Sequence, residues 1–222
     1  MSITIAGQEI RIPLGKVELS GIMMVPENAT SIVIFSQSVE SSRYSTRNNF
    51  VAEILQNRGF ATLLFDPLTE EEDQEPENRS NIDLLTKRLE YVLEWIGINP
   101  ATKELKIGLY GTSRGATSEM RVAAIMEDKV HAVVCRGGMP ELSNELLEII
   151  KAPTLLIVGE LDQNGIELNR NIYEQLNCIK AVQIIDGATH LFNEPGKLEK
   201  VAWFAIEWFE THLSKITAKY EY

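Results

Sequence analysis

Short apolar runs alternate with helical patterns along most of the chain from about residue 31. Runs of this kind, with few charges inside them, predict strands that are buried on both faces, as in a parallel sheet. They lie at residues 31–35, 61–65, 105–110, 131–135, 154–158 and 181–185. The pattern therefore predicts a central sheet whose strands are separated along the chain by other elements.

The segments between these runs carry apolar residues at helical spacing. One stripe covers residues 50–55, with Ser45 as the expected N-cap and Gly59 as the expected stop signal. Two further stripes cover 82–96 and 198–209. Strands that alternate with helices predict βαβ units, which form a mostly parallel sheet with helices on both faces.

The first 26 residues follow a different pattern. Polar and apolar residues alternate over 2–6, 9–12 and 16–19, with no helical segment between them. Alternation of this kind is typical of strands with one exposed face. We therefore expect an antiparallel pair at one edge of the α/β sheet.

Composition is compatible with one globular domain. The chain has 222 residues, of which 44% are hydrophobic and 24% are charged, so we expect residues 1–222 to form a single domain. Acidic residues outnumber basic ones by 32 to 21, which gives a net charge of −11. Such a charge disfavours binding to nucleic acids and to anionic membranes, because both are themselves negative.

Several features of the sequence predict a cytoplasmic location. No apolar run is long enough to cross a bilayer, and the N-terminus lacks the basic and apolar parts of a signal peptide. The two cysteines, Cys135 and Cys178, fit a reducing compartment. Acidic residues crowd into 70–77, which we expect to be a solvent-exposed loop. No cluster has the spacing of metal ligands, and we expect no metal or cofactor.

The sequence Gly111-Thr-Ser-Arg-Gly115 fits the pattern G-x-S-x-G. An expected strand enters it and an expected helix, at about 114–127, leaves it. This strand–turn–helix setting is the one that a nucleophile elbow requires, because the sharp turn exposes the serine oxygen. The alternative is a glycine-rich turn with an idle serine. The context favours Ser113 as a nucleophile.

A serine hydroxyl needs a base to take its proton and an acid to orient that base. Of the three histidines, only His190 lies in a loop at the expected C-terminal end of a strand. Asp162 follows another strand in the same way, and Glu160 is the alternative acid. The chain order of Ser113, Asp162 and His190 is the nucleophile–acid–base order of α/β-hydrolases.

These motifs resemble the α/β-hydrolase fold and, within it, the dienelactone hydrolase-like family of small enzymes without a lid. The resemblance covers most of the chain and is carried further by residues 41–53, 61–69, 136–140, 151–159 and 188–192. It implies the same catalytic roles for Ser113, Asp162 and His190. True dienelactone hydrolases use a cysteine nucleophile, so the serine here favours a generic ester. The short segment 136–142 leaves no room for a cap domain.

One loop departs from the family pattern. After the first long parallel strand the family has His-Gly-Ser-Gly-Ser-Ser, whereas residues 37–42 here are Gln-Ser-Val-Glu-Ser-Ser. The resemblance implies that backbone N–H groups near Ser38 and Val39, together with that of Arg114, form the oxyanion hole. The loss of both glycines makes positive φ angles costly in this loop.

The same loop brings a carboxylate, that of Glu40, toward the site. Because a lone carboxylate would oppose a developing oxyanion, we expect Glu40 to pair with Arg114 across the mouth of the site. The alternatives are a pair between Glu40 and Arg43, or exposure of the side chains of Glu40 and Arg114. The expected rim of the site consists of Gln37, Glu40, Met139, Leu161 and Phe192.

We therefore expect a serine hydrolase, either a carboxylesterase or a lactonase-like enzyme. Its substrate would be a small ester, thioester or lactone, cleaved through an acyl-enzyme without any cofactor. The alternative is a non-catalytic protein with the α/β-hydrolase fold, which binds a small ligand or a partner. The triad favours the enzyme, and the altered loop at 37–42 favours the alternative. The pattern leaves the oligomeric state open.

Overall fold

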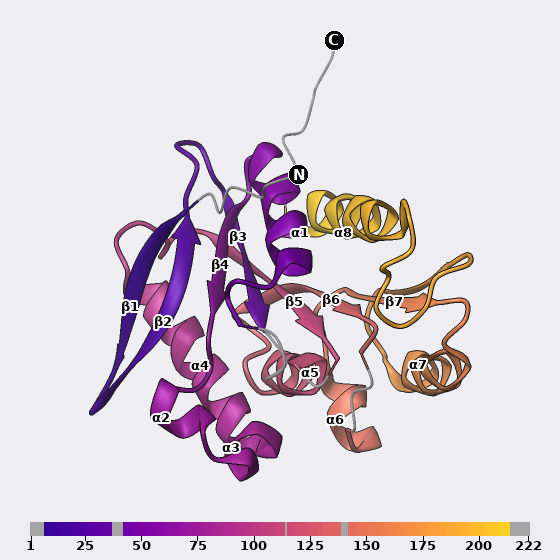
Figure 1. The fold of residues 1–222 in the computed structure, drawn as a ribbon, viewed down its shortest axis with the longest axis horizontal. Helices are drawn as coiled ribbons and strands as arrows, with labels where there is room; N and C mark the ends of the chain where they lie inside the picture. Colours follow the sequence, from indigo (N-terminus) through magenta and orange to yellow (C-terminus); the bar gives the residue numbers. More distant parts are fainter. Residues whose placement is uncertain (1–6, 37–41, 114, 139–141, 214–222) are drawn as a thin grey trace.

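The computed structural model describes residues 7–36, 42–113, 115–138 and 142–213 of the chain (Figure 1). Eight strands in the described part form one sheet, in the order β1-β2-β4-β3-β5-β6-β7-β8. These strands are β1 (Gln8–Leu14), β2 (Val17–Met24), β3 (Ser31–Ser36), β4 (Ala61–Phe65), β5 (Lys106–Thr112), β6 (Val130–Arg136), β7 (Thr154–Gly159) and β8 (Lys180–Ile185). All six predicted buried strands are present, within two residues of their expected ends.

The sheet is parallel except at its N-terminal edge. β3 pairs in parallel with β4 and β5, and the parallel pairing continues to β8. β1 pairs antiparallel with β2, and β2 pairs antiparallel with β4. The predicted antiparallel edge is therefore confirmed, although the expected alternation at 2–6 lies outside the described residues.

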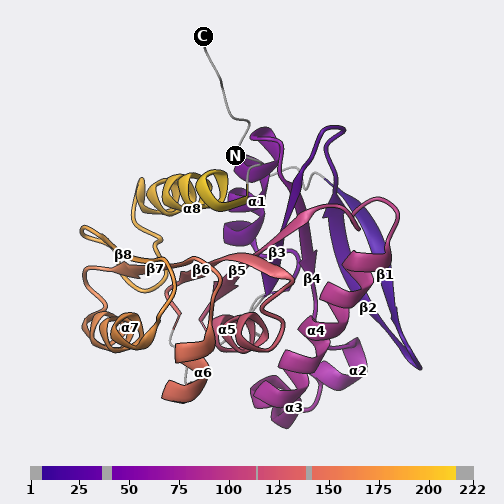
Figure 2. The ribbon, with the colours of Figure 1, turned by 180° about the vertical axis from the view of Figure 1, so that it is seen from behind.

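Helices cover both faces of the sheet, as predicted (Figures 1 and 2). α1 and α8 pack together on one face, and α4, α5, α6 and α7 lie on the other. Two short helices, α2 and α3, precede α4. Their bounds are α1 (Thr46–Asn57), α2 (Glu70–Asp73), α3 (Pro76–Ser80), α4 (Ile82–Ile98), α5 (Gly115–Ile125), α6 (Asn144–Ile149), α7 (Gln163–Gln175) and α8 (Lys197–Leu213).

Two apolar cores form, one on each side of the sheet. Ile32 and Ile34 of β3 belong to the core under α4 and α5, whereas Val33 and Phe35 belong to the core under α1 and α8. Successive side chains of a strand point to opposite faces, so a central strand must be apolar at every position. This is why the predicted strands have continuous apolar runs.

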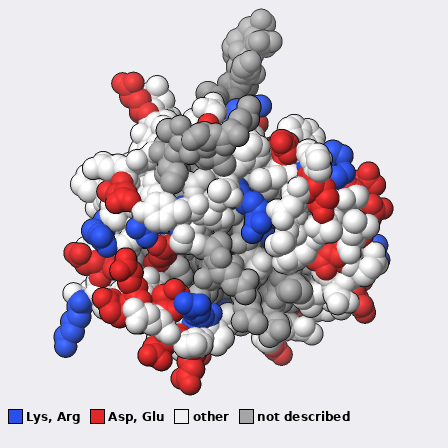
Figure 3. All heavy atoms as spheres, viewed as in Figure 1, with Lys and Arg blue, Asp and Glu red and all other residues white. Residues whose placement is uncertain are grey.

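The acidic stretch is not the open loop that the sequence predicted. Residues 70–73 and 76–80 form α2 and α3, because Thr69 and Glu72 make a reciprocal capping box and Pro76 begins the second helix. Glu72 also forms an ion pair with Arg88 of α4. In Figure 3 acidic side chains gather densely over the region of β1, β2 and α2.

Candidate active site

A serine lies on a sharp turn at the C-terminal edge of the sheet. β5 ends at Thr112 and α5 begins at Gly115, so Ser113 stands between strand and helix. The backbone of Ser113 has a φ of 50°, in the left-handed region that non-glycine residues seldom adopt. Such local strain is typical of a nucleophile elbow and of functional sites in general.

His190 reaches this serine from the loop that follows β8. Its Nε2 lies 3.3 Å from the Oγ of Ser113, and its Nδ1 lies 3.0 Å from Oδ2 of Asp162. With the proton on Nδ1, His190 donates to Asp162 and leaves Nε2 free to accept from the serine hydroxyl. The structure therefore brings the three residues of the predicted triad into one chain of hydrogen bonds.

Asp162 is held in place by the helix that it begins. Its Oδ1 accepts a hydrogen bond from the backbone N–H of Gly165, 3.0 Å away, and so caps α7. The other oxygen, Oδ2, is thereby directed to His190. The Asp162 side chain is 15% exposed, against 31% for His190, so water has limited access to their contact. Capping fixes the carboxylate in the orientation that the histidine requires.

Two glycines at the ends of neighbouring strands let the histidine loop approach closely. A Cβ on Gly159 would lie 2.4 Å from the carbonyl oxygen of Ala188. A Cβ on Gly137, whose φ is +53°, would lie 3.0 Å from the carbonyl oxygen of His190. Any larger residue at these positions would push His190 away from Ser113. Neither glycine was predicted as a site residue, although Gly159 directly follows a predicted strand and Gly137 lies two residues after another.

Carboxylates also anchor the loop that carries His190. Oε2 of Glu160 accepts a hydrogen bond from the backbone N–H of Gly187, 2.7 Å away. Glu160, the alternative acid, therefore contacts the loop, and Asp162 is the residue bonded to the histidine. Oε1 of Glu194 accepts from the hydroxyl of Thr189, 2.6 Å away, and this hydrogen bond lowers the pKa of Glu194.

A buried arginine lies next to this loop. Arg136 ends β6, opposite Thr112 of β5, and is only 8% exposed. Its Nε and Nη1 have no hydrogen-bond partner in the described structure, and burial lowers the pKa of its guanidinium. Its guanidinium lies 5.8 Å from the ring centre of Phe192. In the sequence, Arg136 stands out only as one residue of the stretch 136–140 that resembles the family. An arginine at a strand end gives no signal that it is buried.

Several predicted site residues cannot be placed. The oxyanion-hole residues Ser38, Val39 and Arg114, and the rim residues Gln37, Glu40 and Met139, lie outside the described residues. The expected pair between Glu40 and Arg114 lies there too. Arg43, the alternative partner of Glu40, forms an ion pair with Asp66.

The two described rim residues differ from each other. Leu161, beside Asp162, is 59% exposed, as a rim residue should be. Phe192 is 1% exposed and packs in the core under α1 and α8, so it is not on the rim. Its backbone has a positive φ of 57°, in the left-handed region that non-glycine residues seldom adopt.

The other two histidines do not reach the site. Nδ1 of His131 accepts from the backbone N–H of Ile107, between two strands, and burial lowers the pKa of His131. His212 packs against Trp208 in α8. Both therefore lie in contacts between secondary-structure elements or within a helix, away from Ser113.

Glu119 is a further residue that the sequence analysis missed. It lies in α5, is fully buried, and accepts a hydrogen bond from the backbone of Ser36 at the end of β3. A signal was available, since Glu119 interrupts the apolar stripe formed by Ala116, Met120 and Ala123. A charged residue within a core-facing stripe is uncommon and often marks a specific contact.

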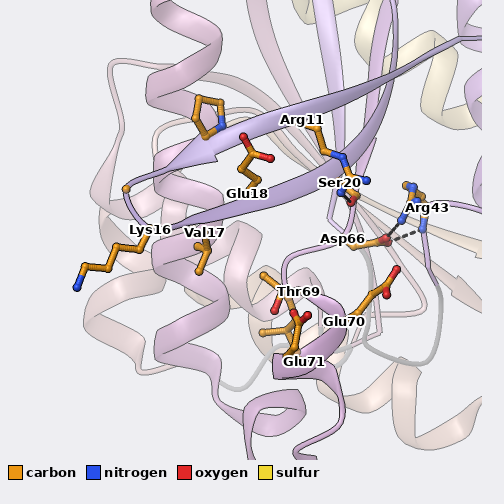
Figure 4. A pocket seen from close by; sticks show the side chains of 13 residues that line it. Arg11, Lys16, Val17, Glu18, Ser20, Arg43, Asp66, Thr69, Glu70 and Glu71 are labelled. Carbon is orange, nitrogen blue, oxygen red and sulfur yellow. Dashed lines mark hydrogen bonds and ion pairs between the residues drawn. The ribbon is translucent and has the colours of Figure 1, made fainter.

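A separate hollow of about 680 Å³ lies between the β1–β2 hairpin and α2 (Figure 4). Arg43 and Asp66 form one wall through their ion pair, and Glu70 and Glu71 lie across from them. None of the triad residues lines it. Its walls are polar and open, so it lacks the apolar enclosure that small-molecule sites usually have.

The described residues offer neither a metal-binding cluster nor a helix suited to a membrane. No group of three His, Cys, Asp or Glu side chains there is arranged to hold a metal ion. None of the described helices combines the length and the apolar character that a membrane crossing needs.

The chain is similar to known proteins over most of its length. The model of the family described as "Dienelactone hydrolase family" matches residues 19–213 of this chain. A Mycobacterium tuberculosis protein with the name "Putative phosphoribosyl transferase" is 44% identical over 206 residues, or 93% of this chain and 46% of that protein. The chain thus spans about half the length of these mycobacterial relatives.

Solved structures show the same similarity. A dienelactone hydrolase from Anabaena variabilis is 44% identical, with a TM-score of 0.90 over 94% of this chain and 99% of that one. Est1E from Butyrivibrio proteoclasticus has a TM-score of 0.80 at 16% identity, over 95% of this chain and 100% of that one. The second likeness concerns the fold alone.

Proposed function

Because the chain belongs to the dienelactone hydrolase family, we propose that it is a serine hydrolase that cleaves a small ester, thioester or lactone. The observation that carries this proposal is the continuous chain of hydrogen bonds from Asp162 through His190 to Ser113. Serine is a poor nucleophile without a base, and the contact between Ser113 and His190 supports His190 in that role.

The reaction follows from the contacts. Ser113 Oγ attacks the carbonyl carbon of the substrate while Nε2 of His190 takes the hydroxyl proton. Asp162 keeps the ring in the required tautomer and stabilises the imidazolium that forms. Collapse of the tetrahedral intermediate expels the alcohol, thiol or ring oxygen, which takes the proton from His190. Water, activated by His190 in the same way, then hydrolyses the acyl-enzyme and restores Ser113.

The oxyanion hole is assigned to backbone N–H groups of Ser38, Val39 and Arg114, all outside the described residues. Such donors survive a change of side chain provided that the backbone keeps its shape. Glu40 and Arg114 are proposed to neutralise each other at the mouth of the site. The proposal needs no metal or organic cofactor, and it includes an open mouth, which the shortness of segment 136–142 supports.

The second candidate is a non-catalytic protein that binds a small ligand or partner through the same fold. The observation that favours it is the replacement of the glycine-containing loop by residues 37–42. The name of the mycobacterial relatives does not change these two candidate functions. They are about twice as long as this chain, which covers 46% of their length, and the family model matches residues 19–213 of this chain.

A fluorophosphonate probe tests the proposal, because it reacts only with an activated serine. The wild-type protein should be labelled at Ser113, as located by mass spectrometry of its peptides. Ser113→Ala and His190→Ala should both lose labelling, whereas Ser80→Ala, which removes an exposed serine, should keep it. A folded wild-type protein that remains unlabelled after long incubation would favour the non-catalytic candidate.

A further inference from the structure

A carboxyl group lies in the interior directly behind the nucleophile elbow. Glu119 belongs to the second turn of α5 and is 0% exposed. Its Oε1 accepts a hydrogen bond from the backbone N–H of Ser36, at a distance of 3.1 Å. Its Oε2 has no hydrogen-bond partner in the described structure, and Glu119 forms no ion pair there. A group so poorly solvated costs stability, which calls for an explanation.

The side chain connects three parts of the site. It extends from α5, whose first residue is only two positions after Ser113, to Ser36 at the end of β3. It also fills the space over Gly111, the first glycine of the elbow. A Cβ at Gly111 would lie 2.1 Å from Oε2 of Glu119 and 2.8 Å from Cα of Ala116. The glycine is therefore needed because the carboxyl group of Glu119 and the helix occupy that space.

The surroundings favour the neutral form of this carboxyl group. Burial raises the pKa of Glu119 well above its usual range, and the single hydrogen bond from Ser36 only partly opposes this effect. Tyr110 of β5 and Cys135 of β6 are the titratable groups that interact with it. Burial raises the pKa of Tyr110 to about 12 and that of Cys135 well above its usual range. Both neighbours are thus uncharged at neutral pH.

We propose that Glu119 is a positioning residue for the nucleophile elbow, acting as a neutral carboxyl group that locks α5 and Gly111 against the end of β3. This inference rests on the proposed serine chemistry. Ser113 has a strained backbone, and strain of this kind persists only where surrounding contacts hold it. Glu119 provides such a contact from behind, without touching substrate or any reacting atom.

The proposal has a consequence for alkaline conditions. Loss of the proton would place an uncompensated negative charge behind Ser113, in a region that water does not reach. That charge would oppose the oxyanion that develops at the substrate carbonyl, and it would favour movements that expose Glu119 to water. Hydrolysis should therefore decline as Glu119 ionises.

Four proteins test the inference: wild type, Glu119→Gln, Glu119→Met and the control Glu167→Gln, which alters an exposed glutamate on α7. The kcat and KM for p-nitrophenyl acetate are measured between about pH 6 and about pH 10, with correction for spontaneous hydrolysis. Glutamine has the shape of the neutral acid, so Glu119→Gln should keep kcat at neutral pH within about threefold and lose the alkaline decline. Glu119→Met should lower kcat about 10- to 100-fold with little change in KM.

A readout that needs no substrate comes from folding. A carboxyl group whose pKa is raised in the folded state makes that state less stable as the pH rises above the unfolded value of about 4.3. The urea midpoint of wild type should therefore fall between about pH 6 and about pH 9, relative to that of Glu119→Gln. Glu167→Gln should follow the wild type.

The outcomes separate the two proposals. An absence of hydrolysis and of labelling at Ser113 in the wild type would overturn the proposed function, and this inference with it. An active wild type whose alkaline decline persists in Glu119→Gln would overturn the inference alone, as would an unchanged kcat in folded Glu119→Met. If Glu119→Met does not fold, the pH profile of Glu119→Gln decides.

Discussion

Single residues around the site show that local contacts and the stability of the fold agree in one case and conflict in another. Asp162 uses one oxygen to cap α7 and the other to hold His190, so the same side chain stabilises a helix and orients the base. Arg136 is different, because its guanidinium is buried with two unpartnered nitrogens. No described carboxylate pairs with it.

Removal of that buried charge should stabilise the fold. Arg136→Met keeps most of the side-chain volume and removes unsatisfied donors, each of which costs about 1–3 kcal/mol when buried. We expect the free energy of unfolding to rise by about 1–3 kcal/mol in urea denaturation. Arg170→Met, at an exposed position on α7, is the control and should change it by less than about 0.5 kcal/mol. A loss of stability in Arg136→Met would mean that the guanidinium is satisfied by contacts not seen here.

At the scale of elements, the ends of helices depend on a few polar side chains. Oδ1 of Asn81 accepts a hydrogen bond from the backbone N–H of Leu84, 3.0 Å away, and caps α4. This helix has 17 residues and buries Leu89, Val92 and other apolar residues against the sheet. Its first turn is thus attached to a large part of the core.

Loss of the cap should be measurable. Asn81→Ala removes the acceptor and should lower the free energy of unfolding by about 1 kcal/mol, whereas Asn81→Ser retains an acceptor and should cost much less. Urea denaturation of both variants provides the comparison. Equal losses in the two would indicate that the capping hydrogen bond contributes little to the stability of α4.

The same scale shows what could be predicted from the sequence. The runs at 61–65 and 154–158 gave strands with almost the observed ends, because a strand buried on both faces leaves a continuous apolar signature. α2 and α3 left no such signature. α2 is held by its capping box and by the ion pair of Glu72 with Arg88, which depends on a helix that follows later in the chain.

The candidate site divides in a similar way. Ser113, Asp162 and His190 could be predicted because parallel strands bring their C-terminal ends to one edge of the sheet, whatever the details of packing. Phe192 was expected on the rim and is buried, because its ring packs among the apolar side chains under α1 and α8, a long-range contact that the sequence does not show. For Glu119, the sequence shows only that a charged residue interrupts a core-facing stripe, and it does not show that the side chain reaches the end of β3.

For the whole molecule, charge is the dominant surface property. The net charge is −11, and acidic side chains are spread over the visible face in Figure 3. Several ion pairs join exposed groups, among them Arg58 with Glu210 and Arg79 with Asp73. Exposed pairs contribute only about 0–1 kcal/mol each, so self-repulsion among the excess acids should outweigh them.

Salt should therefore stabilise the protein. An increase in NaCl from about 10 mM to about 150 mM shortens the screening length from about 30 Å to about 8 Å. We expect Tm to rise by about 2–4 °C in a thermal melt at neutral pH, as a gain of about 1 kcal/mol would produce. The same change of salt near the isoelectric point should leave Tm almost unaltered. A fall in Tm with salt would show that ion pairs outweigh the repulsion.

The strand order also separates the parts of the site by their place in the chain. Ser113 follows β5, Asp162 follows β7 and His190 follows β8. Ser36 and the loop after it belong to the first third of the sequence. A genetic exchange at any point between β4 and β5 would exchange that loop and leave the nucleophile, base and acid together. Under the proposed function, such an exchange would replace the loop proposed for the oxyanion hole while the proposed proton-transfer groups pass on unchanged. In the laboratory, two fragments divided before β5 should each carry an incomplete site, and hydrolysis would report their reassembly.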